Sequence, residues 1–511
     1  MYAYFWILVV AFIIWLGRRA SQPSIYEHIK SNLSPDGKIT PAGVKLPDED
    51  AVKAKAGIGF VPGAHDVSIG DPEDPENEVM AQKAFELIIS FCDRPSSKKR
   101  EAVIAFVREH QTILYIEQLL QLLGNRRGSA WRLWRLAHAL ATESSDREVV
   151  KMGIALLSLL GEDYERKIVM TLGKHEEFTF FAAATIACAS PAAETEIWKL
   201  ARHVSGWGRI HCVERLSKTK DPEIKRWLLR EGYRNDISNA NIAHTCAVAG
   251  DLKAALQGCV DEALLTAAGE IIEGLLEGSR DGYMEDYADG AVVMERYLAL
   301  WADGAGAVSD LLRAATIRDW LGDTEGKWPE RAEKGLSVPT VSYYARFPAR
   351  GNWPKLLERG WTQELRAHLQ RVVREVIDRP IWRPMVVEQL QSKEYAVVFD
   401  ADRAADVLGL DTWPYHWARL QESPDTGAWW MFVDRATTRQ AMESVVALAE
   451  DVFDLSAIAT GPADELGLGD AYLQHRCLDW VLQELKKHPG IGLRLIEAGI
   501  KSPVVGNRNL A

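Results

Sequence analysis

The sequence predicts an all-α fold, and three of its features support this prediction. Apolar residues recur at helical spacing along most of the chain, as at Ala84, Ile88 and Phe91. Trp131 and Trp134 continue this pattern and are expected on a core face. Alternation of apolar and polar residues between two-residue turns, which would indicate strands, is nearly missing. Side chains that begin helices recur about every 30 residues, which indicates a repeated helical unit.

The composition is that of a folded, acidic protein. At ~150 residues per domain, 511 residues correspond to about three domains, and 47% hydrophobic residues exclude wholesale disorder. The net charge of -12 argues against nucleic acid as a partner. Arginines such as Arg132 and Arg135 are typical of the solvated face of a helix. The six cysteines form no C-x-x-C pair, which excludes zinc knuckles and fits a reducing compartment.

Residues 1–19 are expected to form a short membrane anchor. Every residue at 2–16 is apolar or aromatic, although this run is shorter than the ~20 residues that usually span a bilayer. A secretory signal would carry its positive charge before the apolar run, whereas Arg18 and Arg19 follow it. Positive charge at that end indicates that the body of the protein lies in the cytoplasm. The alternative is a buried terminal helix or strand.

The rest of the chain divides by composition into four segments. Residues 20–78 are rich in Pro, Gly, Ser and Asp, so we expect a flexible linker, in which 71–76 forms no packed element. Residues 79–321 are expected to form an N-terminal helical repeat array. Residues 322–362 are crowded with Gly and Pro and predict a hinge. Residues 363–511 predict a C-terminal helical array, which ends in an incomplete unit that needs a cap or a partner.

The helix starts in the N-terminal array set the scale of the repeat. Ser190 precedes Pro191 and Asp221 precedes Pro222, so each pair places a capping oxygen before a proline at the first helical position. Asp251 follows in the same style, and the three caps lie 31 and 30 residues apart. Two short helices in about 30 residues are typical of a HEAT-like α-solenoid. An irregular helical array is the alternative.

A search for chemical motifs finds few candidates. The sequence contains no Glu-x-x-His or H-E-x-x-H metal motif, no haem-thiolate loop, no P-loop and no G-x-S-x-G elbow. The glycines at 57–63 resemble a dinucleotide-binding pattern, but Pro62 stands where the helix would begin, so we interpret them as a loop. The sequence therefore predicts no metal site and no flavin or haem site.

The densest polar cluster lies near the C-terminus and is the candidate binding site. The Gly- and Pro-rich loop at 460–469 contains Asp464 and Glu465, and His475 and Arg476 follow on the next predicted helix. We expect these carboxylates to pair with His475 or Arg476, in a binding or acid–base site. The alternative is a turn between repeats with its own ion pair. His244 and Cys246 form a weaker candidate, because a catalytic pair needs contact across the fold.

Two stretches of the chain resemble a known group of bacterial proteins. The first reads EGYRNDISNA at 231–240 and CAVAGDL at 246–252, and the second reads ATGPADELGLG at 459–469 and HRCLD at 475–479. PGIG at 489–492 and SPVV at 502–505 extend the second stretch, and NRN at 507–509 ends it. Over about residues 220–511 the chain is similar to the α-helical family named limonene hydroxylase.

The resemblance implies an NAD(P)H-dependent monooxygenase that converts limonene to carveol and perillyl alcohol, with possible alcohol dehydrogenase activity. It assigns no role to any single residue. The alternative, which the residue patterns favour, is a non-enzymatic α-solenoid scaffold, tethered to the membrane, that binds partner proteins.

Overall fold

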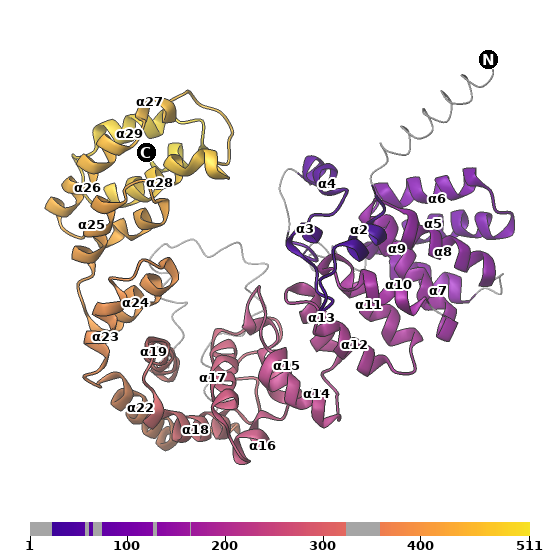
Figure 1. Ribbon diagram of the computed structural model, residues 1–511, viewed down its shortest axis with the longest axis horizontal. Helices are drawn as coiled ribbons and strands as arrows, with labels where there is room; N and C mark the ends of the chain where they lie inside the picture. Colours follow the sequence, from indigo (N-terminus) through magenta and orange to yellow (C-terminus); the bar gives the residue numbers. More distant parts are fainter. Residues whose placement is uncertain (1–22, 57–60, 65–73, 126–129, 164, 323–357) are drawn as a thin grey trace. The chain divides into compact units, whose positions relative to one another are not determined.

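The computed structural model describes residues 23–56, 61–64, 74–125, 130–163, 165–322 and 358–511 (Figure 1). Within these ranges helix follows helix, there is no strand, and three isolated bridges are the sole β-type pairings. The all-α prediction is confirmed. The expected anchor at 1–19 and most of the expected hinge, at 323–357, lie outside the described residues. No helix in the described ranges combines the length and the apolar character needed to cross a bilayer.

The described chain divides into two compact units. The first contains the described residues up to Leu300 together with 358–362. Its helices are α2 (Ile25–Ser31), α3 (Pro41–Val44), α4 (Glu49–Ala56), α5 (Pro75–Asp93), α6 (Ser97–Glu109), α7 (Thr112–Gly124), α8 (Ala130–Glu143), α9 (Arg147–Leu157), η1 (Ser158–Asp163), α10 (Arg166–Leu172), α11 (Glu176–Ala189), α12 (Ala193–Ala201), α13 (Trp207–Arg215), α14 (Pro222–Trp227), η2 (Leu228–Gly232), η3 (Asn239–Asn241), α15 (Ala243–Ala249), α16 (Leu252–Gln257), α17 (Glu262–Glu277) and α18 (Gly290–Trp301).

The second unit begins at Trp301 and, among the described residues, resumes at Gln363. Its helices are η4 (Ala302–Gly304), α19 (Val308–Gly322), α22 (Gln363–Ile377), α23 (Trp382–Gln389), α24 (Tyr395–Leu408), α25 (Trp413–Glu422), η5 (Gly427–Arg435), α26 (Arg439–Val452), α27 (Leu455–Ile458), η6 (Asp470–Tyr472), α28 (Leu473–Leu485), α29 (Leu493–Ile500) and α30 (Val505–Leu510). The unit boundary differs from the expected one, because α19 packs on α22 and α24 of the second unit instead of ending the first array.

The expected linker at 20–78 is wrong for the residues that the structure describes. This segment forms α2, α3 and α4, and Ile25 and Ile29 of α2 are fully buried. The segment at 71–76 was expected to form no packed element, but Asp74 caps α5 and Pro75 is its first residue. Pro and Asp mark a helix start here because proline fixes a helical φ where no N–H is needed.

The predicted helix starts agree with the structure where the cap is an aspartate. Asp221 accepts the N–H groups of Glu223 and Ile224 at the start of α14, with Pro222 as the first residue. Asp251 caps α16 by accepting the Ala254 N–H. Asp251 itself has a φ of 59°, a left-handed conformation that a short polar side chain tolerates.

Two other expectations about the helices are wrong. The Ser190 side chain accepts the Ala192 N–H, but α12 begins only at Ala193. Trp131 was expected in the core, yet it is 62% exposed at the start of α8. The buried face of α8 is formed instead by Leu136, Ala137, Leu140 and Ala141.

The core of the first unit is densest where α9 lies between α8 and α11. Every residue of α9 from Val149 to Leu157 is buried. Close approach of α8 depends on Gly153, where an added Cβ would lie 2.5 Å from the backbone nitrogen of Ala141. The core of the second unit is aromatic, with Trp430 fully buried against Phe453.

Candidate functional site

The loop that carries the predicted binding cluster does not bring its side chains together. Asp464 is fully exposed, and its carboxylate lies 3.7 Å from the Arg508 guanidinium. Glu465 accepts a hydrogen bond from the Tyr472 hydroxyl at 2.6 Å. The backbone of Glu465 pairs with Pro503 and Val505, so the loop is held by backbone hydrogen bonds to the last turn of the chain.

Neither His475 nor Arg476 forms a hydrogen bond or ion pair with the two carboxylates, and both ring nitrogens of His475 are buried without a hydrogen-bond partner. The Arg476 guanidinium, on α28, donates to the Gly469 carbonyl at the end of the loop at 2.6 Å. His475 is buried beside the Tyr472 ring, and this burial lowers its pKa, so the imidazole is neutral near pH 7. Asp464 and Glu465 thus form no direct hydrogen bond or ion pair with these residues, although the charge of Glu465 acts on His475 and opposes the lowering of its pKa.

The weaker candidate, Cys246 with His244, lacks a reactive thiol. Cys246 is fully buried on α15, and this burial raises its pKa well above the usual value. Only a thiolate acts as a nucleophile, so this cysteine is a packing residue at neutral pH.

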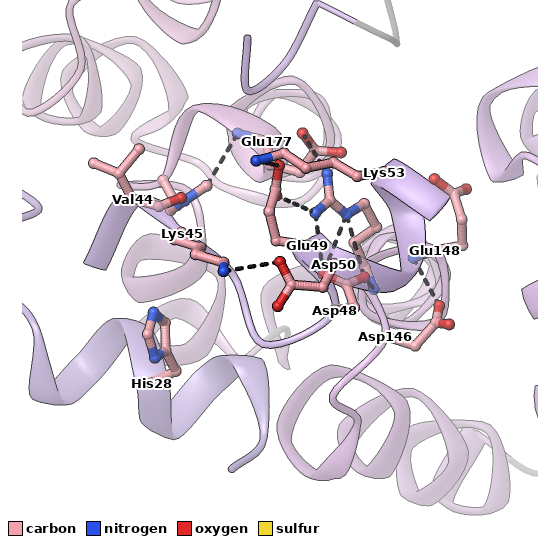
Figure 2. A network of polar contacts seen from close by, with 12 residues as sticks. His28, Val44, Lys45, Asp48, Glu49, Asp50, Lys53, Asp146, Glu148 and Glu177 are labelled. Atoms are coloured by element: carbon pink, nitrogen blue, oxygen red, sulfur yellow. Dashed lines mark hydrogen bonds and ion pairs between the residues drawn. The ribbon is translucent and has the colours of Figure 1, made fainter. Parts of the chain in front are cut away.

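A buried charged cluster lies where the segment at 23–64 packs on α9 and α11 (Figure 2). Arg147, at the start of α9, donates to the Asp48 carboxylate at 3.1 Å and to Glu49 at 2.7 Å. Lys151, one turn later, is 1% exposed and lies 2.8 Å from Glu177 of α11. Glu177 also accepts the Gly63 N–H at 3.1 Å.

The electrostatics of this cluster favour a structural role. Burial by itself raises the pKa of Glu177, but Lys151 and Arg147 offset this effect and lower the pKa to about 2. The Nε2–H of His175 donates to the Val44 carbonyl at 3.1 Å, and burial lowers the pKa of this imidazole, which keeps it neutral. Each charged group here has a partner of opposite charge, so the cluster fixes the N-terminal segment in place.

The candidate site that the structure adds is a cleft of about 420 Å³ in the first unit, which we name the α6–α8 cleft. The end of α5, the start of α6 and one face of α8 form its walls. Its lining combines cationic and aromatic side chains with serines at a helix start, and comprises Phe91, Pro95, Ser96, Ser97, Arg100, Trp134, Arg135, His138, Ala139 and Glu143.

Several contacts hold the walls of the cleft. Arg132 of α8 donates to the carbonyls of Cys92 and Asp93, and so ties α8 to the end of α5. The indole N–H of Trp134 donates to Glu165 at 3.0 Å. The same carboxylate lies 3.6 Å from Nδ1 of His138. Glu165 thus orients the Trp134 indole by a hydrogen bond, whereas Nδ1 of His138 has no hydrogen-bond partner.

The two arginines that line the cleft differ in whether they form an ion pair. Arg100 pairs with Glu143 at 2.9 Å, and both side chains are substantially exposed, at 42% and 62%. Arg135 is exposed and makes no hydrogen bond or ion pair within the described part of the chain. The cleft therefore presents one unpaired guanidinium and one that is weakly paired.

Sequence reasoning missed this cleft for a specific reason. Trp131, Trp134 and His138 lie at spacings of three and four, which the apolar pattern assigned in part to a core face. Arg135 was assigned to a solvated helix face, and it is exposed. What identifies the site is the start of α6 opposite these residues, and that is a tertiary contact.

Comparison with known proteins adds no assignment. No protein-family model matches the chain, and searches of the curated proteins and of the solved structures give no significant match. Within the described residues, no three His, Cys, Asp or Glu side chains are grouped so as to hold a metal ion.

Proposed function

We propose that this protein is a helical-repeat scaffold that binds a segment of a partner protein. The observation that carries this proposal is a set of hydrogen bonds between turns about 30 residues apart. Glu176, at the start of α11, accepts the N–H groups of Ser205 and Gly206 at 2.7 and 2.9 Å. In the next turn Asn235 donates to the Gly206 carbonyl at 2.8 Å.

The separation of these contacts supports a repeated unit. Arg230 pairs with Asp261, 31 residues later, at 2.9 Å. From Ser238 onward the contacts between successive turns are longer, at 36 to 40 residues. The shorter interval, up to Asp261, matches the spacing of the capping residues in the sequence. These contacts between successive turns support the proposed HEAT-like α-solenoid, a fold whose continuous surface is suited to binding other proteins. The α6–α8 cleft is the place on that surface where we expect the partner to bind.

A peptide selection tests the scaffold function directly. Random peptides displayed on phage are selected on the purified full chain, and we expect an enriched common sequence pattern. Trp134→Ala, in the cleft, is expected to abolish this enrichment, because the indole forms one wall of the site. Trp480→Ala removes an exposed tryptophan of α28 and is the matched control. Selection without any common pattern would contradict the proposal.

The resemblance to limonene hydroxylase implies a different function, which stays a prediction. It is tested by following NADPH oxidation by the full chain with and without limonene, and by analysing the products for carveol and perillyl alcohol. Limonene-dependent turnover would overturn the purely non-enzymatic proposal. The membrane anchor at 2–16 likewise stays a prediction, tested by fractionating cells that express the full chain.

A further inference from the structure

We propose that the α6–α8 cleft binds a phosphorylated side chain of the partner protein. This inference rests on the proposed scaffold function and names the chemistry of the bound segment. It depends on three features that meet in one cleft: a helix start, two guanidinium groups and a fixed aromatic wall.

The start of α6 supplies donors for an anion. α6 has 13 residues, and Ser96 caps it by accepting the Lys99 N–H at 3.3 Å. The N–H groups of Ser97 and Lys98, in the first turn, have no partner within the helix. These donors and the positive end of the helix dipole favour a negatively charged group. The first turn of α6 therefore forms the anion-binding end of the cleft.

Arg100 and Arg135 add two positive charges to the cleft, which favours an anion with two negative charges over one with a single charge. Arg135 has no partner among the described residues, and its guanidinium matches the paired oxygens of a phosphate. Arg100 is held by Glu143 in a solvent-exposed ion pair, and such pairs contribute little to stability. A phosphate dianion carries a larger negative charge than the Glu143 carboxylate and accepts bidentate hydrogen bonds from guanidinium groups, so it can displace Glu143 from Arg100.

The aromatic wall of the cleft indicates that the ligand is a peptide and not a free phosphate ion. Trp134 lines the cleft and its indole donates to Glu165. Its ring stacks on Trp131, which lies outside the lining, with centroids 4.5 Å apart. Phe91 lines the same cleft. A volume of about 420 Å³ lies in the range of ligand pockets and exceeds the need of a phosphate ion. An apolar side chain next to the phosphorylated residue is expected to occupy this space.

A binding experiment on the full chain tests the inference. Isothermal titration calorimetry compares a short peptide with a central phosphoserine flanked by leucines, its unphosphorylated copy, a copy with glutamate in place of phosphoserine, and inorganic phosphate. We expect the phosphopeptide to bind at least tenfold more tightly than the other three, because a dianion engages both guanidinium groups.

Three variants locate the binding. Arg135→Gln is expected to weaken phosphopeptide binding about tenfold, because it removes charge-assisted hydrogen bonds. Glu143→Gln is expected to strengthen binding about threefold, because it frees Arg100 from a competing carboxylate. Arg226→Gln changes an exposed arginine of α14, outside the cleft, and is expected to leave the affinity unchanged.

The outcomes separate this inference from the scaffold function. If phage selection yields a common pattern but the phosphopeptide binds no better than its glutamate copy, the inference fails and the scaffold stands. If inorganic phosphate binds as tightly as the phosphopeptide, the peptide assignment is wrong. Equal binding by the Arg135→Gln variant and the unmodified chain would place the site elsewhere. If no peptide binds and selection finds no pattern, both proposals fail.

Discussion

Lys151 and Glu177 carry opposite charges into the interior of the first unit. Lys151 is 1% exposed, and its ammonium group lies 2.8 Å from one oxygen of Glu177 and 3.2 Å from Glu148. Removing two charges from water costs several kcal/mol per ion, so such a pair persists only with well-placed partners. The Gly63 N–H and Arg147 supply further partners to Glu177. The pair thereby joins three segments that are distant in the sequence.

Replacing Glu177 tests this cluster at neutral and acid pH. Glu177→Gln is expected to lower the free energy of unfolding by about 3 to 5 kcal/mol at pH 7, because Lys151 loses its nearest carboxylate. In the folded protein the Glu177 pKa is about 2, below its ordinary value of 4.5. Its contribution to stability is therefore present above pH 4.5 and is lost as the pH falls toward 2.

Urea unfolding at pH 7 and pH 3.5 measures this dependence. The difference between the variant and the unmodified chain is expected to shrink at pH 3.5. Glu101→Gln, an exposed position on α6, is the control and is expected to change little at either pH. An equal loss for Glu177→Gln at both pH values would contradict the assigned pKa.

At the scale of single elements, the local sequence predicts where helices begin better than it predicts how they pack. The caps at Asp221 and Asp251 were predictable because each aspartate accepts hydrogen bonds from residues two or three positions away. The exposure of Trp131 was not predictable, because helical spacing defines a face but not whether a neighbour covers it. α2, α3 and α4 were missed because short helices separated by Pro and Gly have the composition of a linker.

The close contact of α8 with α9 is tested by one substitution. Gly153→Ala is expected to lower the free energy of unfolding by about 1 to 3 kcal/mol, because its Cβ would meet the α8 backbone. Gly124→Ala, in α7, is the matched control, because the nearest atom to its Cβ is 4.0 Å away. The control is expected to be neutral or to gain up to about 1 kcal/mol. Equal effects in chemical denaturation would contradict the packing.

At the scale of the whole molecule, the two compact units have separate cores. The first contains the packing of α8, α9 and α11, and the second contains an aromatic cluster around Trp430, whose indole donates to the Pro424 carbonyl. Each unit has its own buried apolar residues, so each is expected to unfold as a cooperative body.

Scanning calorimetry of single and double variants tests this independence. Trp430→Ala is expected to cost about 3 to 5 kcal/mol and to shift only the transition of the second unit. Gly153→Ala is expected to shift only the transition of the first. In the double variant the two effects are expected to add, because the sites share no partners. A single transition that both substitutions shift would show that the units unfold together.

The sequence by itself determined the all-α class and the aspartate caps at Asp221 and Asp251, because these depend on residues close together in the chain. Tertiary structure decided which charged side chains are buried and where a cleft forms. Asp48 and Arg147 are 99 residues apart in the chain, so no local sequence pattern predicts their ion pair. The α6–α8 cleft likewise requires the start of one helix to face side chains of another, and helical periodicity carries no information about such an arrangement.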